Sequence, residues 1–195
     1  MASRRQQILD TAAELFAERG FHGVTVDDLG AALGMSGPAL YHHFTSKESI
    51  LDEMLVNISR FLLAEGRLRT GAAASPDNAV RELLRGQIDF ALDQTTLITV
   101  HHRELIHASV DGRQQIRRLQ AEYTSVWVDV LIQLDPSLDR RRGLAATHAV
   151  LGLINSTRFS RHVDRATMSS MLFDMSYAAL AATFAGDLPV ASPLS

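Results

Sequence analysis

The sequence predicts an all-helical protein in two parts, and three observations support this fold class. Apolar residues recur at spacings of three and four along most of the 195 residues, and beyond residue 77 no stretch alternates as a half-buried strand would. Near the N-terminus, a glycine turn separates two brief helical patterns. A segment rich in Gly, Ala, Ser and Pro at residues 70–76 then divides a smaller helical part from a larger one.

Composition narrows the class of protein. The 46% hydrophobic content is enough for a sizeable core, and the absence of cysteine excludes disulfides and thiolate metal sites. The first twenty residues carry acidic side chains and helical periodicity, which is typical of neither a signal peptide nor a transit peptide. No run of apolar residues approaches the 18 that a membrane span needs. We therefore expect a cytoplasmic protein with no membrane-spanning helix.

The first predicted helix covers residues 3–19 and ends at Gly20. Its apolar face consists of Ile8, Leu9, Ala12, Leu15 and Phe16. Arg4 and Arg5 precede that face. They either reach a phosphate or the minor groove of DNA, or form a solvated, frayed terminus.

Residues 25–44 then read as two short helices joined by a tight turn. Thr25 and Asp28 have the spacing of a capping box, and Gly34 ends the first helix. Ser36 caps the second helix, which we place at residues 37–44, with Pro38 in its first turn. This is the helix-turn-helix arrangement, whose second helix can enter a DNA major groove.

The outward face of that second helix supplies the candidate DNA contacts. Tyr41, His42 and His43 can bind phosphate, and so can Lys47 in the first turn of the next helix. Gly37, Pro38 and Ala39 offer base edges only apolar contact, so His42 or the shape of the DNA would carry part of the specificity. The alternative makes Tyr41 a core residue and the histidines ordinary surface groups.

Charge argues against a general basic surface. The net charge is −3, and residues 1–50 contain four Lys or Arg against six Asp or Glu. Affinity for DNA must therefore come from a few placed groups and from dimerisation.

This stretch resembles the DNA-binding domain of TetR-family transcriptional regulators. The residues in register with the family pattern are Thr25, Leu29, Gly34, Ser36, Leu40, Tyr41, His43, Phe44, Lys47 and Ile50. The close match covers about a quarter of the chain, and it adds Thr25 and Ser36 to the DNA-binding set. Gly30 departs from the usual alanine, which should weaken its helix by about 1 kcal/mol.

The predicted domains follow from these patterns. Residues 1–46 form the DNA-binding domain, residues 47–186 a regulatory domain that begins with a connecting helix at 47–68, and residues 187–195 a loose tail. Further helices are expected at 77–93, 95–108, 113–134, 138–159 and 165–185, with Asp111 and Gly112 breaking the chain.

The last two helices carry small and flexible apolar residues on their outer sides. These are Ala145, Ala149 and Gly152 on the first, and Met171, Met175, Ala178 and Ala182 on the second. Two copies of such a pair can bury these sides in a four-helix bundle, as the resemblance also implies. The alternative is that the pair only completes the core of one protomer.

The resemblance implies a small-molecule effector in the second domain. Candidate lining residues are Phe61, Phe90, His107, Tyr123 and Trp127, although an aromatic stripe is more often plain core. The segments at residues 123–131 and 148–160 also resemble regulators of fatty-acid or steroid catabolism, which respond to acyl-CoA thioesters.

We therefore expect a homodimeric, ligand-responsive repressor of a palindromic operator, with no cofactor and no catalytic motif. An activator of the same fold is the alternative. A helical metal-binding protein or enzyme built around the histidines at 101–107 is a more remote one, because their spacing does not place them on one helix face. The operator, the regulated genes and the ligand cannot be read from the sequence.

Overall fold

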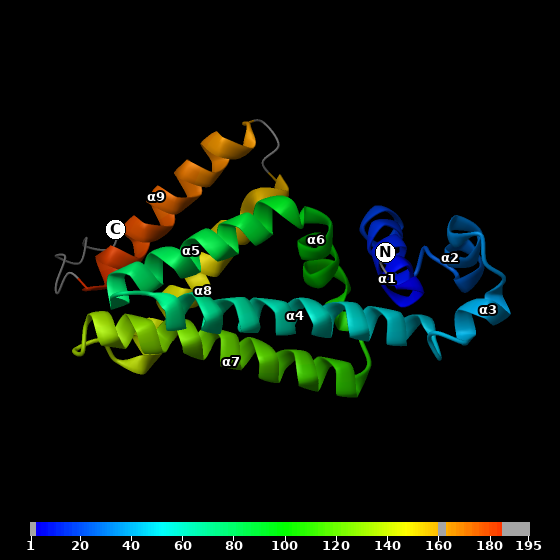
Figure 1. Ribbon diagram of the computed structural model, residues 1–195, viewed down its shortest axis with the longest axis horizontal. Helices are drawn as coiled ribbons and strands as arrows, with labels where there is room; N and C mark the ends of the chain where they lie inside the picture. The colour runs from blue at the N-terminus through cyan, green and yellow to red at the C-terminus, as the bar shows by residue number, and fades with distance from the viewer. Residues whose placement is uncertain (1–2, 160–162, 185–195) are drawn as a thin grey trace, which may run out of the picture. The chain divides into compact units, whose positions relative to one another are not determined.

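The computed structural model describes residues 3–159 and 163–184, and within these every regular element is helical, as predicted (Figure 1). The elements are α1 (Arg4–Arg19), α2 (Val26–Leu33), α3 (Gly37–Tyr41), α4 (Lys47–Ala72), α5 (Pro76–Asp93), α6 (Thr95–Glu104), the 3₁₀ turn η1 (Leu105–His107), α7 (Val110–Leu134), α8 (Arg140–Asn155), the 3₁₀ turn η2 (Ser156–Phe159) and α9 (Arg165–Phe184).

The helices form two compact units, each built from two separate stretches of chain. Unit 1 contains residues 1–64 and 93–123, and unit 2 contains residues 65–92 and 124–195. Helices α4 and α7 each contribute their first part to unit 1 and their remainder to unit 2. The expected boundary after residue 46 stays a prediction.

Unit 1 is organised around α1. The side chains of Ile8, Ala12 and Phe16 are completely buried, as the apolar periodicity predicts. Helix α6 packs along α1, where Arg103 donates a hydrogen bond of 3.1 Å to the carbonyl oxygen of Ala17. The element pairs α1–α2 and α2–α3 complete this side of the unit.

The start of α7 differs from our expectation. We predicted that Asp111 and Gly112 would break the chain, but both lie in the first turn of α7. Two hydrogen bonds explain the early start. The hydroxyl of Ser109 accepts from the N–H of Gly112 at 2.9 Å, and a carboxylate oxygen of Asp52 accepts from the N–H of Ser109 at 2.9 Å. The carboxylate of α4 therefore caps α7, and no local pattern reveals this partner.

Other helix ends also move. Helix α4 continues to Ala72, so the predicted connection at 70–76 shrinks to residues 73–75. Helix α8 ends at Asn155 and is followed by η2, where one helix to residue 159 was expected. The predicted tail at 187–195 lies outside the described residues.

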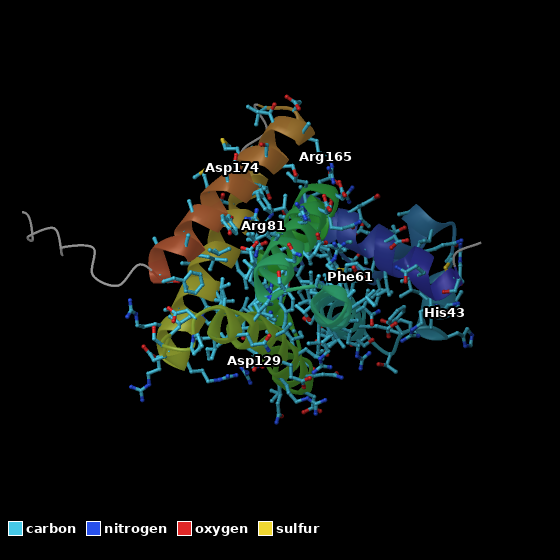
Figure 2. The ribbon with its side chains drawn as sticks, turned by 60° about the vertical axis from the view of Figure 1, so that its left-hand side comes forward. His43, Phe61, Arg81, Asp129, Arg165 and Asp174 are labelled. Carbon is cyan, nitrogen blue, oxygen red and sulfur yellow. The ribbon has the colours of Figure 1, made fainter. Side chains whose placement is uncertain are left out.

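A cluster of three polar side chains, Asp77 and Arg81 of α5 and Tyr177 of α9, connects these two helices within unit 2. Arg81 is labelled in Figure 2. The hydroxyl of Tyr177 donates to Asp77 at 2.6 Å, and Arg81 donates to Asp77 at 2.7 Å and to the Tyr177 oxygen at 2.9 Å. The guanidinium also lies 4.2 Å from the centroid of the Tyr177 ring. The hydrogen bonds from Arg81 and then Tyr177 hold the pKa of the Asp77 carboxyl below its usual range.

We expect Asp77→Asn to lower the free energy of unfolding at pH 7 by about 0.5–1 kcal/mol, because the bonds are only partly buried and solvent weakens them. A carboxyl with a depressed folded pKa stabilises the fold above its unfolded pKa of about 3.9, and loses this effect as pH falls through the folded pKa. The deficit of the variant should therefore shrink in denaturant titrations at pH 3. Asp174→Asn, at an exposed position on α9, is the control and should cost almost nothing at either pH.

Candidate nucleic-acid interface

The turn between α2 and α3 fixes how the second helix of the pair is presented. Gly34 has φ +62°, a left-handed conformation that favours glycine. The N–H of Met35 donates to the carbonyl of Gly30 at 2.8 Å and that of Gly34 to Ala31 at 3.3 Å, which together form a Schellman motif. At the other end, the predicted capping box of Thr25 and Asp28 is present.

Gly30 has a second role in this turn. A Cβ atom at Gly30 would lie 2.7 Å from the carbonyl oxygen of Met35, which is closer than such atoms approach. The glycine therefore permits the tight return of the chain into α3.

Helix α3 is short, ending at Tyr41 instead of the expected residue 44. The hydroxyl of Ser36 accepts from the N–H of Ala39 at 3.4 Å, which confirms the cap. Leu40 and Phe44 are buried, as predicted, whereas Tyr41 is 53% exposed and is therefore not a core residue. Pro38 and His42 are also exposed, and Gly37, Ala39 and His43 are half-buried. Their contact with DNA stays a prediction.

Lys47 is engaged within the protein. Its ammonium donates hydrogen bonds of 2.7 Å to the carbonyl oxygens of both Phe21 and Val24, and lies 4.2 Å from the centroid of the Phe21 ring. The lysine thus ties the start of α4 to the loop between α1 and α2. Its third N–H leaves the predicted phosphate contact open, but removing the side chain would also disturb this loop.

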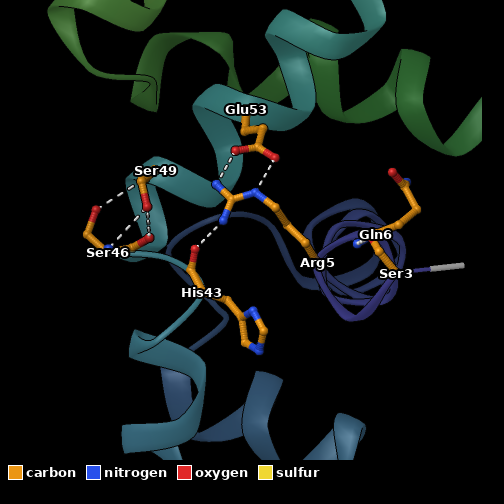
Figure 3. Close-up of polar contacts among 7 residues, drawn as sticks. All are labelled: Ser3, Arg5, Gln6, His43, Ser46, Ser49 and Glu53. Atoms are coloured by element: carbon orange, nitrogen blue, oxygen red, sulfur yellow. Dashed lines mark hydrogen bonds and ion pairs between the residues drawn. The ribbon is translucent and has the colours of Figure 1, made fainter.

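The side chains of the two N-terminal arginines form hydrogen bonds with other elements of unit 1. Arg4 donates a hydrogen bond of 2.8 Å to the carbonyl oxygen of Leu33 at the end of α2. Arg5 binds the carbonyl oxygen of His43, just beyond α3, and both carboxylate oxygens of Glu53 on α4 (Figure 3). Sequence reasoning missed Glu53 because it lies 48 residues from Arg5. The predicted contacts of these arginines with DNA remain predictions.

The five candidate ligand residues are divided between the units. Phe90 and Trp127 are buried in unit 2, and Tyr123 is buried in unit 1. His107, also in unit 1, stacks on Phe21 with ring centroids 5.5 Å apart. Phe61 is 51% exposed. Two surface pockets of about 500 Å³ in unit 2, one beside residues 73–76 and one between α5 and the start of α9, are lined by other residues.

The candidate dimer residues share one property, which is that all seven are exposed on the protomer. Helices α8 and α9 pack against each other, and on these helices Val150, Ile154, Leu172 and Leu180 are buried. Met171 and Met175 are 43% and 48% exposed. Within the described part of the chain, the pair therefore leaves these small and apolar side chains exposed.

The histidines at 101–107 have other surroundings. His101 contacts the side-chain amide of Gln120 at 2.6 Å, and burial, with a smaller effect of His102, lowers the pKa of its imidazole. Among residues 3–159 and 163–184, no group of three or more His, Asp or Glu is arranged to hold a metal ion. In the same part of the chain, no helix is both long and apolar enough to cross a bilayer.

Comparison with known proteins points to one family. The sequence profile of the bacterial regulatory proteins of the tetR family matches residues 8–54. The repressor KstR2 of Rhodococcus jostii is 35% identical over 133 residues, covering 67% of this chain and 64% of that protein. The activator FasR of Mycolicibacterium smegmatis is 28% identical over 168 residues, covering 83% of this chain and 74% of that protein.

Structural comparison agrees. The ketosteroid transcriptional regulator KstR2 of Mycobacterium tuberculosis superposes with a TM-score of 0.75 at 27% identity, over 93% of this chain and 95% of that one. The sequence alignments with KstR2 proteins span a little under two thirds of those relatives' length. The profile covers the whole helix-turn-helix and the fold match extends across both units, so the chain belongs to the TetR family of regulatory proteins.

Proposed function

We propose that the protein is a cytoplasmic, homodimeric transcriptional repressor that binds a palindromic operator through α3 and is released by a small hydrophobic effector. The observation that carries the DNA-binding part is the exposed face of α3. Tyr41 and His42 point away from the core, while the caps, the Schellman turn and the arginine contacts hold the helix ends. A two-fold dimer would place two copies of α3 in major grooves about 34–36 Å apart, or a multiple of that distance.

Repression is supported by the KstR2 relatives, and activation by the likeness to FasR. The likeness to the ketosteroid regulator KstR2 supports a steroid- or lipid-derived effector. An acyl-CoA thioester is the first candidate, because residues 123–131 and 148–160 resemble regulators that respond to such thioesters. Effector binding would favour a state in which the two copies of α3 no longer match the operator spacing, with a coupling of about 1–3 kcal/mol.

We expect selection from a pool of random duplexes, at two salt concentrations, to enrich a palindromic motif with the wild-type protein. Tyr41→Ala should lower affinity for that motif about tenfold, because a hydrogen bond to charged phosphate is lost at each half-site. Tyr41→Phe is the matched control, since it removes only the hydroxyl and should account for most of the loss. A Tyr41→Ala protein with wild-type affinity, or a wild type that enriches no motif, would contradict the proposal.

A reporter gene placed behind the enriched motif then separates the two signs of regulation. Deletion of the gene that encodes the protein should raise expression of the reporter if the protein is a repressor, and should lower it if the protein is an activator. Fatty-acyl and steroid-derived CoA thioesters, compared with the free acids, test the effector class by their release of the labelled duplex.

A further inference from the structure

The guanidinium of Arg5 joins three elements of unit 1 at one point (Figure 3). Arg5 lies on α1. Its Nε atom donates a hydrogen bond of 2.7 Å to the carboxylate of Glu53 on α4, and a second nitrogen donates to the other oxygen of that carboxylate. The third nitrogen donates to the carbonyl oxygen of His43. The group also lies 4.0 Å from the centroid of the buried Phe44 ring. We call this set of contacts, made by Arg5 with His43, Phe44 and Glu53, the Arg5 latch.

The latch acts on the segment that leaves α3. The N–H groups of His43 and Phe44 both bond to the carbonyl of Leu40, so the His43 carbonyl is rigidly connected to the end of α3. A cation at the C-terminal end of a helix is also favoured by the helix dipole. The bond to Glu53 raises the pKa of the Arg5 guanidinium, a group that is charged at neutral pH in any surroundings.

We propose that Arg5 is a positioning residue for operator binding, which fixes α3 against α4 without touching DNA. The proposal rests on the proposed function, because it requires that α3 reads DNA. A planar fork that serves a carboxylate and a carbonyl at once has a geometry that lysine cannot reproduce. Nε and both terminal nitrogens of Arg5 each donate one bond within the protein, which uses three of the five N–H groups and fixes the plane of the guanidinium.

The competing role for Arg5 is a direct contact with a DNA phosphate. Substitution of Glu53 distinguishes this role from the positioning role. If Arg5 contacts phosphate, Glu53 draws it away and adds negative charge, so Glu53→Gln should tighten binding. If Arg5 acts through the latch, Glu53→Gln weakens the contact that orients the guanidinium toward His43 and should weaken binding even though it removes a negative charge. The two roles therefore predict opposite signs for one substitution.

The test uses full-length Arg5→Ala, Arg5→Lys, Glu53→Gln and the Arg5→Ala/Glu53→Gln double variant, with the selected operator and a motif-free duplex of equal length. We expect each to lose about tenfold in operator affinity, comparable to the loss of one charged hydrogen bond, while binding to the motif-free duplex stays unchanged. The double variant should lose no more than either single one. The slope of log affinity against log salt should stay at the wild-type value.

The matched controls change the same charges elsewhere. Arg19→Ala removes a cation at the far end of α1, and Glu14→Gln removes an exposed anion from α1. Both should bind the operator as the wild type does, apart from a small effect of net charge. A salt slope reduced by about one per protomer in Arg5→Ala, with tighter binding by Glu53→Gln, would overturn the latch in favour of a phosphate contact.

Hydrogen exchange of the free protein tests positioning without DNA. Amides of residues 37–45 should exchange about tenfold faster in Arg5→Lys than in the wild type, with α5, α8 and α9 unchanged. Unchanged exchange in that segment would overturn the latch whatever the DNA result. Faster exchange together with a wild type that shows no preferred DNA sequence would leave the latch standing and refute operator binding.

Discussion

Replacing Met171 and Met175 with glutamate should convert the protein into a monomer and abolish tight operator binding. Both side chains are about half exposed on α9, where Ala178 and Ala182 are exposed as well. In the proposed four-helix bundle, the new carboxylates would be buried without partners, which costs several kcal/mol per dimer. A monomer retains one half-site, so affinity for the palindrome should fall at least a hundredfold.

Light scattering or analytical ultracentrifugation would report the oligomeric state, and a duplex-binding titration would report the affinity. Leu68→Glu is the control, because Leu68 is a 67% exposed apolar residue that belongs to α4 and to neither α8 nor α9. It should leave both the dimer and the affinity unchanged. If the double glutamate variant remains dimeric at micromolar concentration, the dimer does not use this face.

Gly112→Ala should destabilise the protein by about 2 kcal/mol. A Cβ atom at this position would come within 2.8 Å of one Asp52 carboxylate oxygen and even closer to the other. Asp52 cannot withdraw freely, since it accepts the N–H of Ser109 at the start of α7. Accommodating the methyl group therefore breaks the cap and separates α4 from α7 at this point.

Thermal and denaturant unfolding measure this effect. Gly71→Ala, near the end of α4, is the opposite control because no atom lies within 4 Å of the added methyl group. It should be neutral or slightly stabilising, since alanine has the higher helix propensity. Equal stability of the two alanine variants would show that Asp52 does not approach Gly112 closely.

Contacts between residues that are close in the sequence were predictable, whereas contacts between distant residues were not. The caps of Thr25 and Ser36 and the turn at Gly34 were predictable, because each depends on residues within a few positions. The exposed faces of α8 and α9 followed from helical spacing in the same way. At the start of α7 the cap by Ser109 is also local, but Asp52, which binds the N–H of Ser109, lies 57 residues earlier and could not be predicted.

Distance along the chain also explains why the contacts within the candidate DNA-binding site were not predicted. The sequence predicts DNA contacts for Arg4, Arg5 and Lys47 from their charge, with a solvated terminus as the alternative for the two arginines. A sequence does not show the carbonyl groups that fold against these cations. Their partners are main-chain oxygens at the ends of α2, α3 and the α1–α2 loop, together with Glu53. Sequence alone therefore located the helix-turn-helix but not the contacts that hold it.

The composition of unit 1 has a consequence for biosynthesis. The segment that the family profile recognises leaves the ribosome early, yet its unit is completed by α6 and the first part of α7. Until residues 93–123 have been synthesised, Phe21, Asp52 and the flank of α1 lack His107, Ser109 and Arg103. We therefore expect these contacts of the helix-turn-helix unit to form only after residues 93–123 have been synthesised.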